Sequence, residues 1–189
     1  MGLATTSTPS ATALKVIGAS SLNHRVWLNF DLAGALPAGT TWDQVQKATL
    51  KVFANTITNT STGSLYITAA PASSTPLSEQ TITHALLGAG LNDPETQAPY
   101  ATVNVVAVTP ARKQYITFNV TELVRDWLDG KVVNNGLIIS GSTLANVTID
   151  SKEDTTTGHP ATLDLVFAPA RVHPRGDASM GIFVNGPQP

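Results

Sequence analysis

The chain contains no cysteine and few charged residues. Without cysteine, disulfides, thiolate zinc sites and cysteine nucleophiles are excluded. Charged residues make up only 13 % of the chain, about half the share of an ordinary soluble domain, so serine, threonine, asparagine and glutamine must supply most of the polar surface. The net charge is −2, and no run of basic residues supplies the clustered positive face that nucleic-acid binding needs. We therefore expect no nucleic-acid partner.

Long hydrophobic runs are also missing. No stretch approaches the ~20 apolar residues that cross a bilayer, so no membrane insertion is expected. The opening residues Met1–Ala4 lack the basic and apolar regions of a secretory signal peptide, and no signal peptide is visible. With 189 residues, the chain has the length of one domain that buries its own core.

The sequence is dominated by an alternation of apolar and polar residues with a period of two, which is typical of half-buried strands. In the clearest example, Val26, Leu28 and Phe30 share one face and Trp27 and Asn29 the other. The nine expected strands are Leu14–Ile17, Arg25–Leu32, Ala48–Ala54, Ser64–Ala69, Thr102–Val108, Gln114–Val120, Gly136–Ser140, Asn146–Asp150 and Thr162–Phe167. Short strands joined in part by long connections predict an all-β fold, an antiparallel β-sandwich with Greek-key or jelly-roll wiring.

One short helix interrupts the strands. Asn119 can cap it, Glu122 follows three residues later as in a capping box, and Gly130 stands where a helix normally ends. About ten residues make a marginal helix in isolation, so we expect its Trp127 face to pack over an open end of the sandwich. The predicted organisation is an extended arm over 1–13, the sandwich over 14–167 and a tail rich in proline and glycine over 168–189.

Five sequence blocks carry a resemblance to a known family. They are His24–Leu32 (HRVWLNFDL), Lys47–Phe53 (KATLKVF), Tyr115–Gly130 (YITFNVTELVRDWLDG), Asn134–Ile139 (NNGLII) and Asp150–Pro160 (DSKEDTTTGHP). In this order they resemble the DNRLRE domain family. The resemblance implies a jelly-roll sandwich similar to carbohydrate-binding modules and found in exported bacterial proteins. It therefore implies an extracellular or cell-surface location. A virus particle is the alternative, which the missing signal peptide favours.

The residue patterns of catalysis are absent from the sequence. The four histidines show no metal-binding spacing, and no glycine-rich phosphate loop or G-x-S-x-G turn occurs. The neighbours Glu153 and Asp154 would point to opposite sides of a strand and so form no carboxylate pair. We expect that the protein is not an enzyme and that it needs no cofactor.

A structural cation remains open. Asp150, Glu153 and Asp154 form the densest acidic cluster, and carboxylates with backbone carbonyls suit Ca²⁺. The alternative is a polar loop whose charge Lys152 balances.

Aromatic residues on the polar phase of several strands are the most informative feature. A ring among polar side chains on an outer sheet face suits stacking on a sugar. The candidate ligand-binding residues are Trp27, Phe53, Tyr66 and Tyr115, with Arg25, Asn29 and Lys51 as polar neighbours. Alternatively, these aromatics pack beneath the helix or the long connections, because exposed aromatic patches are uncommon without a partner.

Two functions follow from these patterns. The first is a non-catalytic extracellular or surface-displayed module, structural or adhesive, with polysaccharide as a possible ligand. The second is an assembly or decoration subunit of a virus particle or filament, whose arms contact other copies of itself or a neighbouring surface protein. In the tail, Ile182, Phe183 and Val184 form the apolar cluster expected to make such contacts.

Overall fold

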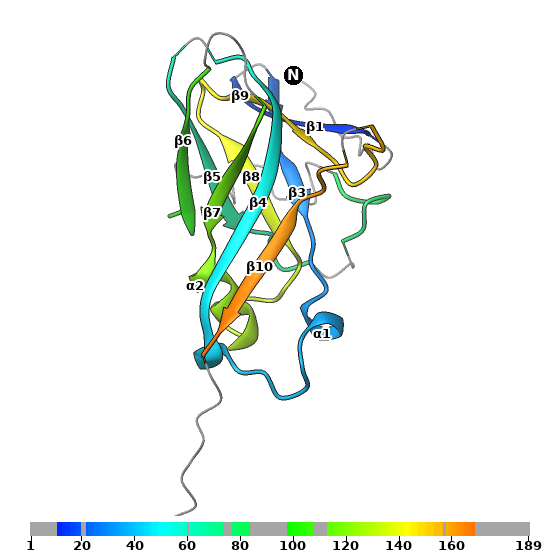
Figure 1. Ribbon diagram of the computed structural model, residues 1–189, viewed down its shortest axis with the longest axis vertical. Coiled ribbons are helices and arrows are strands. Elements are labelled where there is room, and N and C mark those ends of the chain that lie inside the picture. The colour runs from blue at the N-terminus through cyan, green and yellow to red at the C-terminus, as the bar shows by residue number, and fades with distance from the viewer. Residues whose placement is uncertain are drawn as a thin grey trace, which may run out of the picture.

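The alternating pattern is realised as two antiparallel β-sheets in the computed structural model (Figure 1). The structure describes residues 11–19, 22–59, 61–73, 77–83, 98–107, 113–156 and 158–168. The elements are β1 Ala13–Ala19, β2 Leu22–His24, β3 Val26–Leu28, α1 Leu32–Ala35, η1 Trp42–Gln44, β4 Val45–Ile57, β5 Gly63–Ala69, β6 Ala101–Val105, β7 Gln114–Asn119, α2 Thr121–Leu128, β8 Leu137–Gly141, β9 Asn146–Asp150 and β10 Thr162–Phe167. The predicted all-β sandwich is confirmed.

The long strand β4 organises the first sheet, which we call sheet A. Its strand order is β10-β4-β9-β1-β2, and β7 pairs with the other edge of β4. Sheet B has the order β3-β8-β5-β6. The chain passes from β3 in sheet B to β4 in sheet A and back to β5, so the connections cross between the two sheets.

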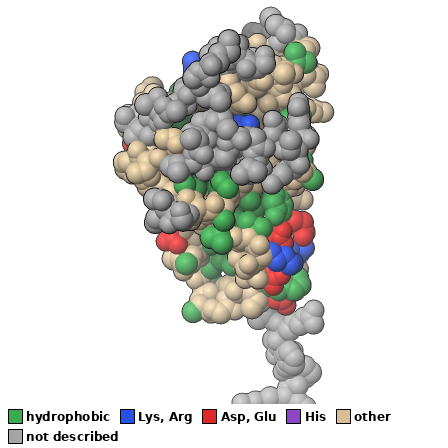
Figure 2. Space-filling model, turned by 180° about the vertical axis from the view of Figure 1, so that it is seen from behind, with side chains coloured by type: hydrophobic (Ala, Val, Ile, Leu, Met, Phe, Trp, Pro, Cys, Tyr) green, Lys and Arg blue, Asp and Glu red, His purple; other side chains and the backbone are tan. Residues whose placement is uncertain are grey.

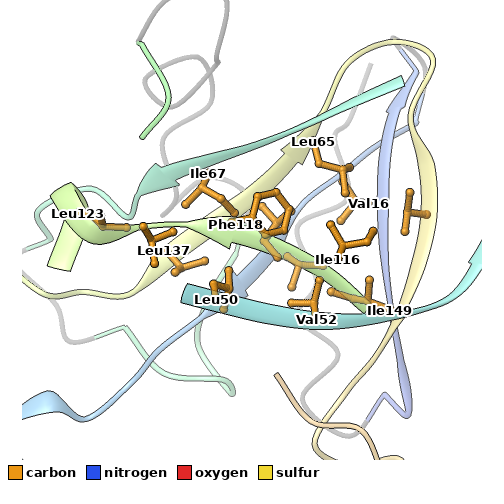
Figure 3. Close-up of a cluster of buried hydrophobic side chains, with 14 of the residues drawn as sticks. Val16, Leu50, Val52, Leu65, Ile67, Ile116, Phe118, Leu123, Leu137 and Ile149 are labelled. Carbon is orange, nitrogen blue, oxygen red and sulfur yellow. The ribbon is translucent and has the colours of Figure 1, made fainter. Parts of the chain in front are cut away.

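The core lies between the two sheets, where inward side chains of both interleave (Figure 3). Leu50 of β4 stands opposite Phe118 of β7, and both are fully buried. They meet Leu65 and Ile67 of β5 and Leu137 of β8, which are also fully buried. Each such side chain contributes about 1.5–3 kcal/mol on burial, so this layer fixes which face of every strand turns outward.

Helix α2 packs on the end of the sandwich, as the sequence predicted, and Leu123, Val124 and Trp127 are buried. It is joined to sheet A by Thr121, whose Oγ1 accepts a hydrogen bond of 3.0 Å from the backbone N–H of Ala48. Gly130 follows with φ +73°, a left-handed conformation that suits glycine at a helix end.

The predicted capping box at the start of α2 is wrong. Asn119 Oδ1 accepts from the Thr121 N–H at 3.2 Å and from the Thr121 hydroxyl at 2.6 Å. The carboxylate of Glu122 instead lies 2.9 Å from Arg125 Nη1. Asn119 belongs to β7, so its side chain bonds to the first helical residue and Glu122 turns to the nearest cation.

The predicted strand Arg25–Leu32 is too long. Strand β3 ends at Leu28 and the buried Leu32 begins α1. The reason is Asp31, whose Oδ1 accepts a hydrogen bond of 2.9 Å from the Gly34 N–H and so favours a helical turn over continued alternation.

The first described residues are held against the loop that follows β9. The Ser151 hydroxyl donates to the Ala11 carbonyl at 2.5 Å, and the Ser151 N–H donates to the Thr12 carbonyl at 3.2 Å. The predicted assembly residues Ile182, Phe183 and Val184 lie outside the described residues. Among the residues that are described, no helix has the length and apolar character needed to cross a bilayer.

Candidate functional site

The predicted ligand-binding residues divide between the two sheets and do not form one patch. Phe53 and Lys51 lie on β4 and Tyr115 on β7, all in sheet A. The remaining four lie on or beside strands of sheet B: Arg25, Trp27, Asn29 and Tyr66. The two groups therefore belong to opposite outer faces of the sandwich.

On sheet B, Trp27 packs beneath a long connection, as the alternative interpretation proposed. Trp27, Leu77 and Ile82 all pack against the same buried pair, Ala70 and Ile138. The indole N–H of Trp27 donates to the Asn135 carbonyl at 2.8 Å. Trp27 lines a hollow of about 920 Å³ along β3. Its ring is half-buried in this apolar cluster and its N–H is already bonded, so it is a weak stacking surface for a ligand.

The other predicted residues of sheet B are polar neighbours of this hollow or lie beyond it. Arg25 Nε donates to Asn23 Oδ1 at 3.4 Å, and Arg25 and Asn29 both line the hollow. Tyr66 is half-buried and stands between Ser140 and Thr102 of the adjacent strands. These residues offer hydrogen bonds without an exposed ring beside them.

On sheet A, three rings meet on the outer face and form what we call the aromatic trio: Phe53, Tyr115 and His159. Phe53 and Tyr115 are a cross-strand pair with centroids 5.0 Å apart and planes at 69°. The imidazole of His159 stacks on Phe53 at 3.9 Å and 16°, and it meets the edge of Tyr115 at 5.9 Å. Tyr115 is 55 % exposed, so it is the ring of the trio that solvent or a ligand reaches most freely.

Beside the trio lies a hollow of about 550 Å³, the sheet-A groove. Its lining residues are Lys51, Tyr115, Thr117, Gly158, His159, Pro160 and Thr162. Thr117, Lys51 and Thr162 stand side by side on β7, β4 and β10, and their hydroxyls and ammonium group form a polar row across the strands. Lys51 also forms an ion pair with Asp164, two residues further along β10.

The length of β4 explains how a loop residue joins this face. Strand β10 pairs with residues 45–51 of β4 and β9 with residues 54–57, both on the edge opposite β7. The register shifts between Ala54 and Thr56. The chain therefore leaves this edge after β9 and returns to it at β10. The connection between these strands, described over residues 151–156 and 158–161, carries His159 onto Phe53.

Asp150, at the end of β9, anchors this loop from below. Its side chain is completely buried, although it is a carboxylate. Asn55, at the register shift, donates from Nδ2 to Asp150 Oδ1 at 3.0 Å, and His159 Nδ1 lies 3.4 Å from Oδ2. Burying a carboxylate is costly unless polar partners surround it, so these contacts keep the loop and the sheet in one register.

The predicted calcium ligands do not come together. Asp150 faces Asn55 and His159, whereas Glu153 forms an ion pair with Lys152. Asp154 Oδ1 accepts a hydrogen bond from the Thr156 N–H at 2.8 Å. In the part of the chain that the structure describes, no group of three or more acidic or histidine side chains is placed to hold a metal ion.

A cluster of charged side chains lies away from the groove, around α2. Lys131 lies 2.9 Å from Asp129 and 3.6 Å from Asp126, and Figure 2 shows acidic and basic side chains gathered on one side of the molecule. The Tyr100 hydroxyl donates to Asp126 at 2.9 Å. Burial, followed by this hydrogen bond and the negative charge, raises the pKa of Tyr100 to about 12. The contact between Tyr100 and Asp126 joins the residue that precedes β6 to α2 and is structural.

Among the residues of the aromatic trio and the sheet-A groove, the sequence pattern pointed to three: Phe53, Tyr115 and Lys51. It did not point to Thr117, Thr162 or His159. Thr117 and Thr162 carry the same alternation as Tyr115 and Lys51, so their outward direction was readable from the strand pattern. His159 follows from no sequence pattern, because a histidine in a loop gives no signal of the ring on which it stacks.

Comparison with known proteins adds one finding. The model of a family described as Carbohydrate-binding module family 96 matches residues 2–163 of the chain. No curated protein matches the sequence.

Proposed function

The chain belongs to carbohydrate-binding module family 96, and from this premise we propose that it binds a glycan in the sheet-A groove without catalysing a reaction. The observation that carries the proposal is the exposed ring of Tyr115, held by Phe53 beside a row of hydroxyl groups. Sugar rings present an apolar C–H face and a rim of hydroxyls, so a binding surface needs a ring and polar groups side by side.

The roles of the residues follow from their exposure. Tyr115 provides the stacking surface, and Thr117, Thr162 and Lys51 supply hydrogen bonds to the hydroxyls of the sugar. Phe53 was predicted to touch the ligand, but one face of its ring lies against His159 at 3.9 Å. Phe53 therefore supports the other two rings and does not itself stack on the glycan.

The absence of catalysis is part of the proposal. Glycoside hydrolysis needs two carboxyl groups on either side of the bond that breaks, and the described residues that line the groove include no aspartate or glutamate. We expect the module to act outside the cytoplasm, where polysaccharides are exposed, in an adhesive or structural role. The assembly alternative rests on the two arms, residues 1–13 and 168–189, of which only residues 11–13 and Ala168 are described, and nothing in the described sandwich favours it.

The experiment is a binding screen with two aromatic variants. Affinity electrophoresis through gels that contain xylan, glucomannan, β-glucan, pectin or alginate should retard the wild-type protein in at least one gel. Tyr115→Ala should lose that retardation. Trp42→Ala should keep it, because Trp42 is similarly exposed, at 45 %, but lies on η1 and does not line the groove. Equal loss in both variants, or retardation of Tyr115→Ala, contradicts the proposal.

A further inference from the structure

The contact between His159 and the buried carboxylate of Asp150 bears on what the groove recognises. Nδ1 of His159 is buried and lies 3.4 Å from Asp150 Oδ2. This exceeds the usual N–H···O distance of about 2.7–3.2 Å, so the contact is better treated as electrostatic than as a full hydrogen bond. Whether this electrostatic contact is attractive or repulsive depends on which imidazole nitrogen carries the proton, so the contact favours one tautomer.

A neutral imidazole carries one proton, on Nδ1 or on Nε2. If Nδ1 carried none, its lone pair would face a carboxylate oxygen inside the protein, and both groups would be acceptors. A proton on Nδ1 turns this repulsion into attraction, and at low local dielectric the difference is larger than in water. The carboxylate cannot turn away easily, because Asn55 Nδ2 holds its other oxygen at 3.0 Å.

We infer that Asp150 is a positioning residue that fixes His159 as the tautomer protonated at Nδ1, so that Nε2 offers its lone pair to the ligand. The imidazole stacks on Phe53, lines the sheet-A groove and is about a third exposed. His159 then accepts a hydrogen bond from a hydroxyl group of the sugar. The ligand half of this inference rests on the proposed function, whereas the tautomer does not.

The imidazole acceptor changes the hydrogen-bonding character of the groove. Lys51 has donors only, and the hydroxyls of Thr117 and Thr162 both donate and accept. Nε2 of His159 adds a group that, while neutral, only accepts. The site therefore selects a glycan that keeps a free hydroxyl at this position and discriminates against one in which that hydroxyl is methylated or acetylated. A site whose acceptor loses its hydrogen-bond partner in this way binds the modified glycan less tightly.

The test begins with a measurement that needs no substitution. Two-bond ¹H–¹⁵N correlation spectra of the imidazole, at about pH 8 and therefore above the ordinary histidine pKa of about 6.5, separate the two tautomers. His159 should show a protonated Nδ1 and an unprotonated Nε2. Asp150→Asn should move it toward the Nε2-protonated form, whereas Asp129→Asn, which alters a carboxylate beside α2, should leave it unchanged. An Nε2-protonated His159 in the wild-type protein overturns the inference.

The ligand half is tested by calorimetry with xylohexaose, cellohexaose, mannohexaose and laminarihexaose, and with the O-methylated form of any that bind. Asp150→Asn should weaken binding about tenfold, and O-methylation of the sugar should do the same to the wild-type protein. Unchanged binding in both experiments overturns the acceptor role of His159 and leaves the proposed function standing. Binding of none of the four sugars, together with no retardation in any polysaccharide gel, overturns the proposed function itself. In that case the NMR measurement of the His159 tautomer still tests whether Asp150 is a positioning residue.

Discussion

Replacing Phe53 and His159 separately and together measures how much the stacking of their rings contributes to the free energy of unfolding. Their rings stack with centroids 3.9 Å apart and planes at 16°, and such a pair contributes about 0.5–1.5 kcal/mol beyond area burial. Phe53 also meets the edge of Tyr115. We therefore expect Phe53→Ala to lower the free energy of unfolding by about 2–4 kcal/mol, somewhat less than the loss of a fully buried phenylalanine. His159→Ala should lower it by about 1 kcal/mol.

The assay is equilibrium unfolding in urea, followed by tryptophan fluorescence, for the wild type, both single variants and the double variant. The coupling energy of the cycle should be about 0.5–1.5 kcal/mol. A second cycle that joins Phe53→Ala with Trp42→Ala serves as the control, and it should be additive within about 0.3–0.5 kcal/mol, because Trp42 lies on η1, which precedes β4. A coupling between Phe53 and His159 no larger than that of the control would refute the conclusion that the stack holds the loop on the sheet.

Three further predictions concern the fold around the site. Gly136 has φ +90°, and a Cβ there would lie 2.4 Å from a backbone oxygen of β3, whereas Gly39 has φ +83° with open space around it. Gly136→Ala should therefore lower the midpoint of thermal unfolding more than Gly39→Ala does. Equal shifts would contradict this. Phe118 is fully buried, so Phe118→Ala should cost about 3–5 kcal/mol in urea unfolding, and a loss below about 1 kcal/mol would place it outside the core. Because burial, followed by the hydrogen bond to Asp126 and the charge of Asp126, raises the pKa of Tyr100 to about 12 in the folded protein against about 10 in an unfolded chain, the stability linked to its protonated phenol is present below about pH 10 and lost toward pH 12. An ultraviolet pH titration in which Tyr100→Phe removes no late-ionising phenol would exclude it.

The strands and the outward direction of their side chains could be predicted from the sequence, because alternation is a local property of the chain. Leu50 and Val52 turn inward and Lys51 and Phe53 outward whatever β4 pairs with. The prediction failed where a local hydrogen bond competed with the pattern. Asp31 closes a helical turn with Gly34, and the alternation from Val26 onward does not reveal this.

The composition of the groove depended on pairings between distant segments. Trp27 and Tyr115 both occupy polar phases of their strands, yet Trp27 packs into a small apolar cluster that also includes Leu77 and Ile82, and Tyr115 stays open. No local signal separates the two rings, since the difference lies in which outer face the connections cover. The acidic residues that suggested a calcium site are divided for a related reason: neighbours in sequence need not face one another, and Asp150 turns toward Asn55 and His159.

The sequence by itself determined an all-β sandwich closed by a short helix, together with the set of side chains that face outward, because a two-residue period and helix end signals are encoded in neighbouring residues. Only the tertiary structure decided that β9 and β10 share one edge of β4, and that the loop between them lays His159 on Phe53 above a buried carboxylate. The physical reason is that strand order and loop placement come from packing two sheets around one core, which joins residues more than a hundred positions apart.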